Sequence, residues 1–212
     1  MNKAQLKTSE NISNTMLESF NQYSERLQGV LATMDWSSVE VLCKKMEECW
    51  RDKKQIFICG NGGSAGNAIH LANDLIYGAG GLRAEALSAN AAVLTCLAND
   101  ISYDSIYSQQ LRVKANPGDM LMVLSGSGNS GNIVNAITMA QSLGMVTVGV
   151  FGFDGGVCKD EVDILIHTPL DDMQIAEDMQ LVVGHMVMQW LSANLININK
   201  PTLEPLALRP TQ

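Results

Sequence analysis

The chain has 212 residues, of which 46% are hydrophobic and 17% are charged, and its formal net charge is −8. This length suits one domain with a helical extension, and the apolar content excludes an intrinsically disordered chain. The negative charge argues against nucleic acid or an anionic membrane as the main partner, although backbone amides can still bind a small phosphorylated ligand.

The five cysteines are scattered along the sequence and form no CxxC pair. This pattern predicts unpaired thiols in a reducing compartment, so we expect a cytoplasmic protein. The first residues lack a basic region followed by an apolar core, so no signal peptide is expected. No run approaches the roughly 18 apolar residues of a membrane span.

Two helices are expected before the first strand. Apolar side chains recur at spacings of three and four residues through residues 8–33, which predicts the first helix. The second is expected to be capped at Asp35 or Ser37 and to run to about Lys53. We therefore expect residues 1–35 to form an N-terminal helix used for oligomerisation, residues 36–200 to form the main domain, and residues 201–212 to form an extended tail.

Strands and helices then alternate along the chain. This alternation predicts an α/β fold of three αβα layers around a five-stranded, mainly parallel sheet, with its ligand crevice at the carboxyl ends of the strands. The expected strands are residues 56–60, 83–87, 120–124, 146–151 and 164–167, and the expected helices are residues 91–98, 104–114, 133–143 and a long one from Asp171 or Asp172 to about 196.

A glycine-rich turn, Gly60-Asn61-Gly62-Gly63-Ser64, follows the first buried strand. Its glycines allow a sharp turn and close approach of a ligand, and Ser64 is expected to cap the next helix. Backbone N–H groups and the positive helix end then form an anion site. His70 and Asp74 follow at i, i+4 and share one face of that helix.

A second such loop, Ser125-Gly126-Ser127-Gly128-Asn129-Ser130, follows another buried strand. It contains no lysine or arginine, so a phosphate here would be bound by hydroxyls, backbone amides and the helix end. The alternative is a turn that merely links strand to helix. Two similar loops at two strand ends favour a ligand site.

The chain has three histidines, and two of them lie on predicted helices near carboxylates. Glu177 and His185 lie on the last helix, about two turns apart and roughly 80° apart around its axis. Together with His70 and Asp74 they form a set that suits zinc. The alternative is that both histidines are ordinary packed helix residues.

These motifs jointly resemble the SIS (sugar isomerase) domain family, and within it the phosphoheptose isomerases. The resemblance spans residues 36–197 and includes Leu97-Ala98-Asn99-Asp100, Gly155-Gly156 and Gly184-His185. It implies a homotetramer with pockets at the subunit junctions. It also implies isomerisation of sedoheptulose 7-phosphate to D-glycero-D-manno-heptose 7-phosphate through a metal-assisted enediol, as used in heptose biosynthesis.

The resemblance also implies roles for individual residues. Substrate would be bound by Asn61, Gly62, Gly63, Ser64, Asn99, Asp100, Ser125, Gly126, Ser127 and Ser130, with the serines on phosphate and the asparagines and Asp100 on sugar hydroxyls. Zinc would be bound by His70, Asp74, Glu177 and His185, and catalysis would use Asp74, Glu177 and His185. Without the resemblance, Asn99 and Asp100 read equally well as a helix C-terminal turn.

Three positions depart from the family pattern. The family has a glutamate where Asp74 stands and usually a glutamine where Glu177 stands, and it often has an arginine just after position 74. Because Asp74 is one methylene shorter, either Asp74 or Glu177 is the candidate base. Two alternatives stay open: a non-catalytic SIS module that binds phosphosugars or proteins, and an isomerase of a different sugar phosphate.

Overall fold

The computed structural model describes the backbone of residues 3–195 and the side chains of residues 15–195. Contacts divide the chain into two compact units, residues 1–36 and residues 37–212. The first unit contains one helix, α1 (Lys3–Thr33), which begins five residues before its expected start. The tail expected at residues 201–212 lies outside the described residues.

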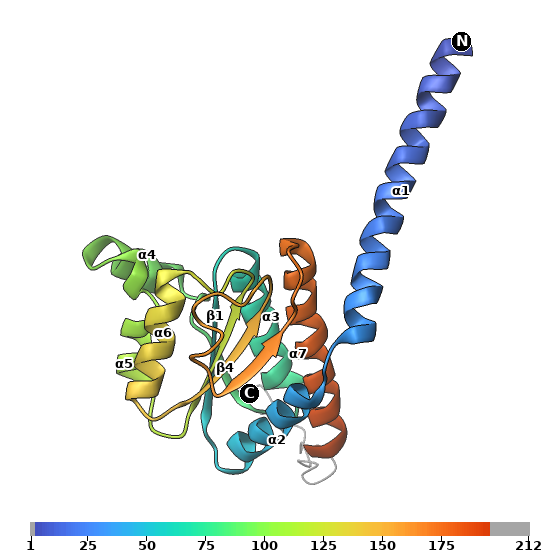
Figure 1. Ribbon diagram of the computed structural model, residues 1–212. Coiled ribbons are helices and arrows are strands. Elements are labelled where there is room, and N and C mark those ends of the chain that lie inside the picture. Colours follow the sequence, from blue (N-terminus) through green and yellow to red (C-terminus); the bar gives the residue numbers. More distant parts are fainter. Residues whose placement is uncertain (1–2, 196–212) are drawn as a thin grey trace, which may run out of the picture. The chain divides into compact units, whose positions relative to one another are not determined.

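The second unit is built on a five-stranded sheet in which every neighbouring pair of strands is parallel (Figure 1). The strand order is β2-β1-β3-β4-β5, so the expected α/β class is confirmed, with an entirely parallel sheet. The strands are β1 (Gln55–Gly60), β2 (Arg83–Ala86), β3 (Met120–Ser125), β4 (Val146–Phe151) and β5 (Ile164–His167).

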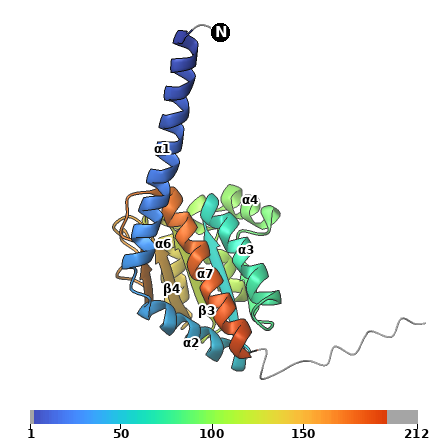
Figure 2. The same cartoon turned by 90° about the vertical axis from the view of Figure 1, so that its right-hand side faces the viewer.

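Helices cover both faces of this sheet. One face carries α2 (Ser37–Arg51), α3 (Gly63–Tyr77) and α7 (Met173–Leu195), with α3 and α7 side by side (Figure 2). The other face carries α4 (Ala91–Asp100), the 3₁₀ turn η1 (Tyr103–Ser105), α5 (Ser108–Lys114) and α6 (Gly131–Ser142) (Figure 1).

The three central strands, β1, β3 and β4, are buried on both faces, as is usual in parallel sheets. Phe57 and Cys59 of β1 pack in the cluster formed with α5 and α6. Because successive side chains of a strand point to opposite faces, the equally buried Ile56 and Ile58 face α2, α3 and α7. Two apolar layers therefore hold the sheet, and its strand ends are left to build loops.

Two local expectations are wrong. Residues 104–114 do not form one helix: η1 ends at Ser105 and α5 starts at Ser108. This break lets the consecutive residues Ile106 and Tyr107 both enter the core, where each is 2% exposed. Ser64 does not cap α3, because Gly62 holds that position and the Ser64 side chain is buried against α7.

Within the described part of the chain, no helix combines the length and the apolar character needed to cross a bilayer. The long helix α7 is bounded as expected at its start, where Asp172 Oδ1 accepts a hydrogen bond from Ile175 N at 3.2 Å.

Candidate active site

The two glycine-rich loops lie next to each other at the carboxyl edge of the sheet. They follow the neighbouring strands β1 and β3, in which Gly60 pairs with Leu124. An amide pair joins them: Asn61 Nδ2 donates to Asn132 Oδ1 at 2.9 Å, and Asn132 Nδ2 donates to Asn61 Oδ1 at 2.8 Å. The structure therefore places both loops side by side, where they could bind the same ligand.

The first loop offers backbone N–H groups. Gly62 has a φ of 57°, which favours glycine, and no side chain caps the helix that starts after it. The N–H groups of Gly63 and Ser64 are thus the candidates to bind a ligand, together with the positive helix end, whereas Ala65 N bonds the Gly62 carbonyl at 3.1 Å. Ser64 is 3% exposed, and its hydroxyl oxygen accepts a hydrogen bond from Gln180 Nε2 at 2.9 Å, so it anchors the loop.

The second loop is shaped by its own serines. Ser125 Oγ is buried and accepts from Gly128 N at 3.0 Å, and Ser127 Oγ accepts from Asn129 N at 3.3 Å. Ser130 stands at the N-cap of α6 in an extended conformation, and its side chain makes no capping bond. Each hydroxyl retains its own O–H to donate, so the loop presents a curved row of donors.

A hollow of about 240 Å³ opens beside the first loop, under α4. Tyr103 reaches the loop from its rim, where its hydroxyl donates to Asn61 Oδ1 at 3.1 Å. Asn99 and Asp100, the expected sugar ligands, are exposed at the end of α4 and bond each other at 2.7 Å. Neither lines this hollow, whose walls are Asn61, Gly62, Ala65, Ser88, Leu94, Thr95, Ala98, Tyr103, Ile106 and Tyr107.

Helices α3 and α7 run in the same direction and pack closely. A Cβ on Gly184 would lie 2.2 Å from Leu71 Cδ2, so glycine is needed for this approach. Polar bonds link the same pair of helices, since Asn67 Nδ2 donates to Gln180 Oε1 at 2.9 Å and to the Glu177 carbonyl at 3.0 Å. The spacing of the two helices is therefore fixed near their functional side chains.

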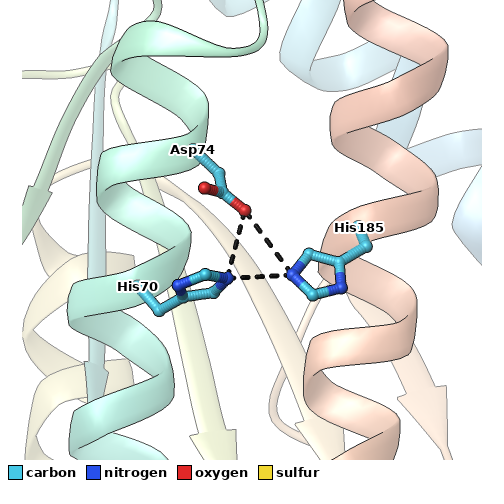
Figure 3. A group of neighbouring side chains, drawn as sticks. All are labelled: His70, Asp74 and His185. Atoms are coloured by element: carbon cyan, nitrogen blue, oxygen red, sulfur yellow. Dashed lines mark hydrogen bonds and ion pairs between the residues drawn. The ribbon is translucent and has the colours of Figure 1, made fainter.

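His70 and Asp74 of α3 point at His185 of α7 across this contact (Figure 3). The two Nε2 atoms are 2.9 Å apart, and Asp74 Oδ2 lies 3.3 Å from His70 Nε2 and 3.5 Å from His185 Nε2. The Asp74 side chain is 17% exposed, whereas both histidines are close to half exposed. We call these three residues the His/Asp/His cluster.

The donor set and size of the His/Asp/His cluster fit a zinc ion. Tetrahedral zinc with ligands at about 2.0–2.1 Å separates them by roughly 3.3 Å, close to the three distances observed. Two imidazoles and one carboxylate leave a fourth position for water or substrate, which is the pattern of catalytic zinc sites.

Glu177, the fourth expected ligand, lies elsewhere. A Cβ on Gly63 would lie 2.3 Å from Glu177 Oε2, so this carboxylate packs against the start of α3. From Gly63 to His70 is about 10 Å along the helix axis. The structure therefore places Glu177 beside the first glycine loop and outside the His/Asp/His cluster.

Several residues that shape the site were not singled out from the sequence. Asn132 follows the second loop directly, so its position was a usable signal. Tyr103 and Tyr107 left no such signal, because only the fold brings them to β1, where the buried Tyr107 hydroxyl donates to the Gly60 carbonyl. Burial raises the pKa of the Tyr107 phenol, so it stays a neutral donor to the loop.

Comparison with known proteins places this arrangement in a family. The family model described as the SIS domain matches residues 19–152. The chain belongs to the SIS domain family. Its SIS fold is shared with a phosphoheptose isomerase from Neisseria gonorrhoeae, whose structure superposes with a TM-score of 0.75 at 26% identity, covering 88% of this chain and 99% of that one.

Relatives of this SIS protein in sequence are also named phosphoheptose isomerase. A phosphoheptose isomerase from Aliarcobacter butzleri is 33% identical over 184 residues, covering 85% of this chain and 97% of the relative. Another from Shewanella denitrificans is 38% identical over 155 residues, covering 70% and 79%.

Proposed function

We propose that this SIS protein is an aldose–ketose isomerase that converts sedoheptulose 7-phosphate to D-glycero-D-manno-heptose 7-phosphate. The observation that carries the proposal is the convergence of three side chains: His70 and Asp74 lie on α3, which begins at the first glycine loop, and they meet His185 of α7. A metal-type cluster and an anion cradle on one helix match the chemistry of a phosphorylated sugar. Relatives named phosphoheptose isomerase supply the substrate.

The phosphate would be bound where the two loops meet. Backbone N–H groups of Gly62 and Gly63, the N–H of Gly126 and the hydroxyls of Ser127 and Ser130 are the proposed donors, and Ser64 and Ser125 hold the loops in shape. Asn61 is the proposed partner of a sugar hydroxyl, because it lines the hollow under α4. Asn99 and Asp100 keep this role only if α4 shifts on binding.

Zinc is the proposed cofactor, bound by His70, Asp74 and His185. When bound, it would polarise the carbonyl and stabilise the enediolate oxygen. The remaining chemistry is a proton transfer. One proton leaves C1 and one arrives at C2, the C1 hydroxyl becomes the aldehyde, and the C2 carbonyl becomes a hydroxyl. A positioned carboxylate can carry the proton between the two carbons.

Glu177 is the proposed carrier of that proton. Asp74 shares its Oδ2 with both histidines, whereas Glu177 lies outside the His/Asp/His cluster and next to the loop that would bind substrate. This division of labour gives the two carboxylates different roles. It also gives a use to the carboxylate that stands where the family usually has an amide.

A second copy of the chain is the proposed partner, within a homotetramer. Large apolar side chains of α3 and α7 are exposed around the His/Asp/His cluster, and they are Ile69, Ile76, Tyr77, Met186 and Trp190. Light scattering of the purified chain would measure the assembly. We also infer a cytoplasmic setting, because all five cysteines are unpaired thiols, and we expect neither nucleic acid nor a membrane as partner.

A turnover screen with metal analysis tests the proposal. Phosphorylated ketoses and aldoses of five to seven carbons would be assayed with and without added zinc, and bound metal would be counted in the purified protein. We expect sedoheptulose 7-phosphate to react and zinc to bind once per chain. If only a different sugar phosphate reacted, the isomerase activity would stand and its substrate would be that sugar phosphate. Absence of both metal and turnover would leave a non-catalytic SIS module.

A further inference from the structure

A basic hollow lies at the amino edge of the sheet, opposite the glycine loops. Its volume is about 440 Å³, within the range of small-molecule pockets. Among the described residues, its lining has four cations and no carboxylate; the walls are Cys49, Trp50, Arg51, Lys53, Lys54, Gly81 and Arg83. A smaller hollow of about 360 Å³ shares Lys53, Lys54 and Arg83 and adds Lys114, and its lining also contains Asp52, Glu85 and Asp119.

This concentration of positive charge is unusual for the chain. The protein has 14 lysines and arginines against 22 aspartates and glutamates, and five of those 14 line the two adjoining hollows. Three carboxylates line the smaller hollow, and two of them pair with cations of this group. Asp52 lies 3.6 Å from Arg51, Glu85 pairs with Lys114 at 2.5 Å, and Asp119 accepts bonds from two backbone N–H groups.

Backbone bonds hold these cations in place. Lys54 Nζ donates to the Pro117 carbonyl at 2.9 Å, and Arg83 NH1 donates to the Lys53 carbonyl at 3.1 Å. An ammonium has three donors and a guanidinium has five, so each still has donors for a ligand. The half-buried Trp50 forms the adjoining wall, and its indole N–H donates to the Gly80 carbonyl at 3.1 Å.

Lys53 occupies a position that does not suit lysine. Helix α2 ends in a Schellman motif, in which Lys54 N bonds the Cys49 carbonyl at 2.8 Å and Lys53 N bonds the Trp50 carbonyl at 3.3 Å. Lys53 therefore takes the left-handed position, with a φ of 54°, where glycine or asparagine is usual. A cation held there against the backbone preference points to a use for its charge.

We propose that this hollow binds a small molecule carrying a di- or triphosphate group. Several fixed cations around one concave space suit adjacent phosphates, and the Trp50 wall suits an attached ring. A long nucleic acid fits poorly, because the net charge of −8 would repel it beyond the hollow. The site is separated from the glycine loops by the length of β1, about 20 Å.

Titration calorimetry with inorganic pyrophosphate and the full chain tests this site. We expect binding to the parent protein, and binding weakened roughly tenfold or more in Lys53→Asn and in Arg83→Gln. Lys53→Asn keeps a residue that accepts the left-handed backbone, so loss of binding cannot be assigned to unfolding. The matched control is Lys45→Gln, on α2 outside the hollow and paired with Glu48, which should bind like the parent.

A second variant decides which end of the sheet binds pyrophosphate. Ser130→Ala should leave its affinity unchanged, because Ser130 belongs to the second glycine loop. The proposal is overturned if Ser130→Ala abolishes binding while Lys53→Asn does not, or if the parent does not bind. A lower melting temperature of Lys53→Asn with unchanged affinity also overturns it, since the cations would then serve only the helix end. ADP as a second probe separates a nucleoside ligand, which binds more tightly than pyrophosphate, from an inorganic one.

Discussion

The two ends of the sheet offer an anion two different environments. At the carboxyl end, the loops after β1 and β3 present backbone N–H groups, hydroxyls and helix starts, with no lysine or arginine in either loop. At the amino end, Arg51, Lys53, Lys54 and Arg83 surround a hollow with full charges. Directed N–H groups select the shape of one phosphate, whereas a group of side-chain cations selects total charge.

The difference matters for catalysis as well as for binding. At the carboxyl end, His70, Asp74 and His185 face one another, so a metal could take the central position among them. In the proposed site, the backbone contacts of the loops would fix where the phosphate sits relative to the metal. Among the described residues, the amino hollow holds no metal-type cluster of this kind, and we propose it only as a binding site.

Of the changes proposed here, removal of either histidine should have the largest effect on activity and metal binding. We expect His70→Ala or His185→Ala to lower kcat/KM by roughly two orders of magnitude or more and to remove bound zinc, because each deletes one of three ligands. The measurement is sedoheptulose 7-phosphate turnover with metal analysis. Lys54→Gln at the other end serves as control and should react like the parent; equal losses in both would contradict a division between the two ends.

Variants of the two carboxylates, Asp74 and Glu177, should differ in how much zinc they retain. Glu177→Gln is expected to lower kcat by about 10²–10⁴-fold with zinc retained, because it removes the proposed base and no ligand. Asp74→Asn is expected to lower zinc affinity as well. Single-turnover kinetics and metal counts on both variants provide the measurement. If Glu177→Gln loses zinc and Asp74→Asn keeps it, the roles are reversed.

Much of this arrangement follows from the sequence, and the exceptions have physical causes. Strands at residues 146–151 and 164–167 were predicted to the residue, because apolar runs and turn residues mark a buried parallel strand clearly. The partnership of His70 with Asp74 follows from helix geometry alone. The prediction that Ser64 caps α3 was wrong, because tertiary packing turns its hydroxyl toward Gln180 of α7.

Positions that depend on two elements were harder to predict. The spacing of Glu177 and His185 gives their angle around α7, but it does not say that Gly63 of α3 will lie against Glu177. The basic hollow was missed for the same reason. Three of its cations lie within residues 51–54, yet Arg83 joins them only because β2 pairs with β1, with Arg83 opposite Gln55.

A methyl group at the first glycine loop should have a moderate effect. Gly63→Ala would place its Cβ within 2.3 Å of Glu177 Oε2, so the flexible Glu177 side chain must turn away. We therefore expect a lower kcat with a change in stability of about 0.5 kcal/mol or less. Gly66→Ala on the same helix meets nothing within 4 Å and should stabilise by about 0.5–1 kcal/mol. Thermal unfolding compares them, and equal shifts would show that Glu177 does not pack there.

The smallest expected effect is a difference between the two sheet ends in how strongly salt weakens anion binding. The cations of the amino hollow are mostly exposed, so their attraction is screened as the Debye length falls from about 10 Å at 0.1 M salt to about 3 Å at 1 M. We expect pyrophosphate to bind several-fold more weakly over this range, measured by calorimetry. The KM for the sugar phosphate should change less, because hydrogen bonds from the loop N–H and hydroxyl groups depend on direction and contact. An equally steep salt dependence at both ends would mean that the glycine loops also attract phosphate chiefly by long-range charge, which their sequence does not supply.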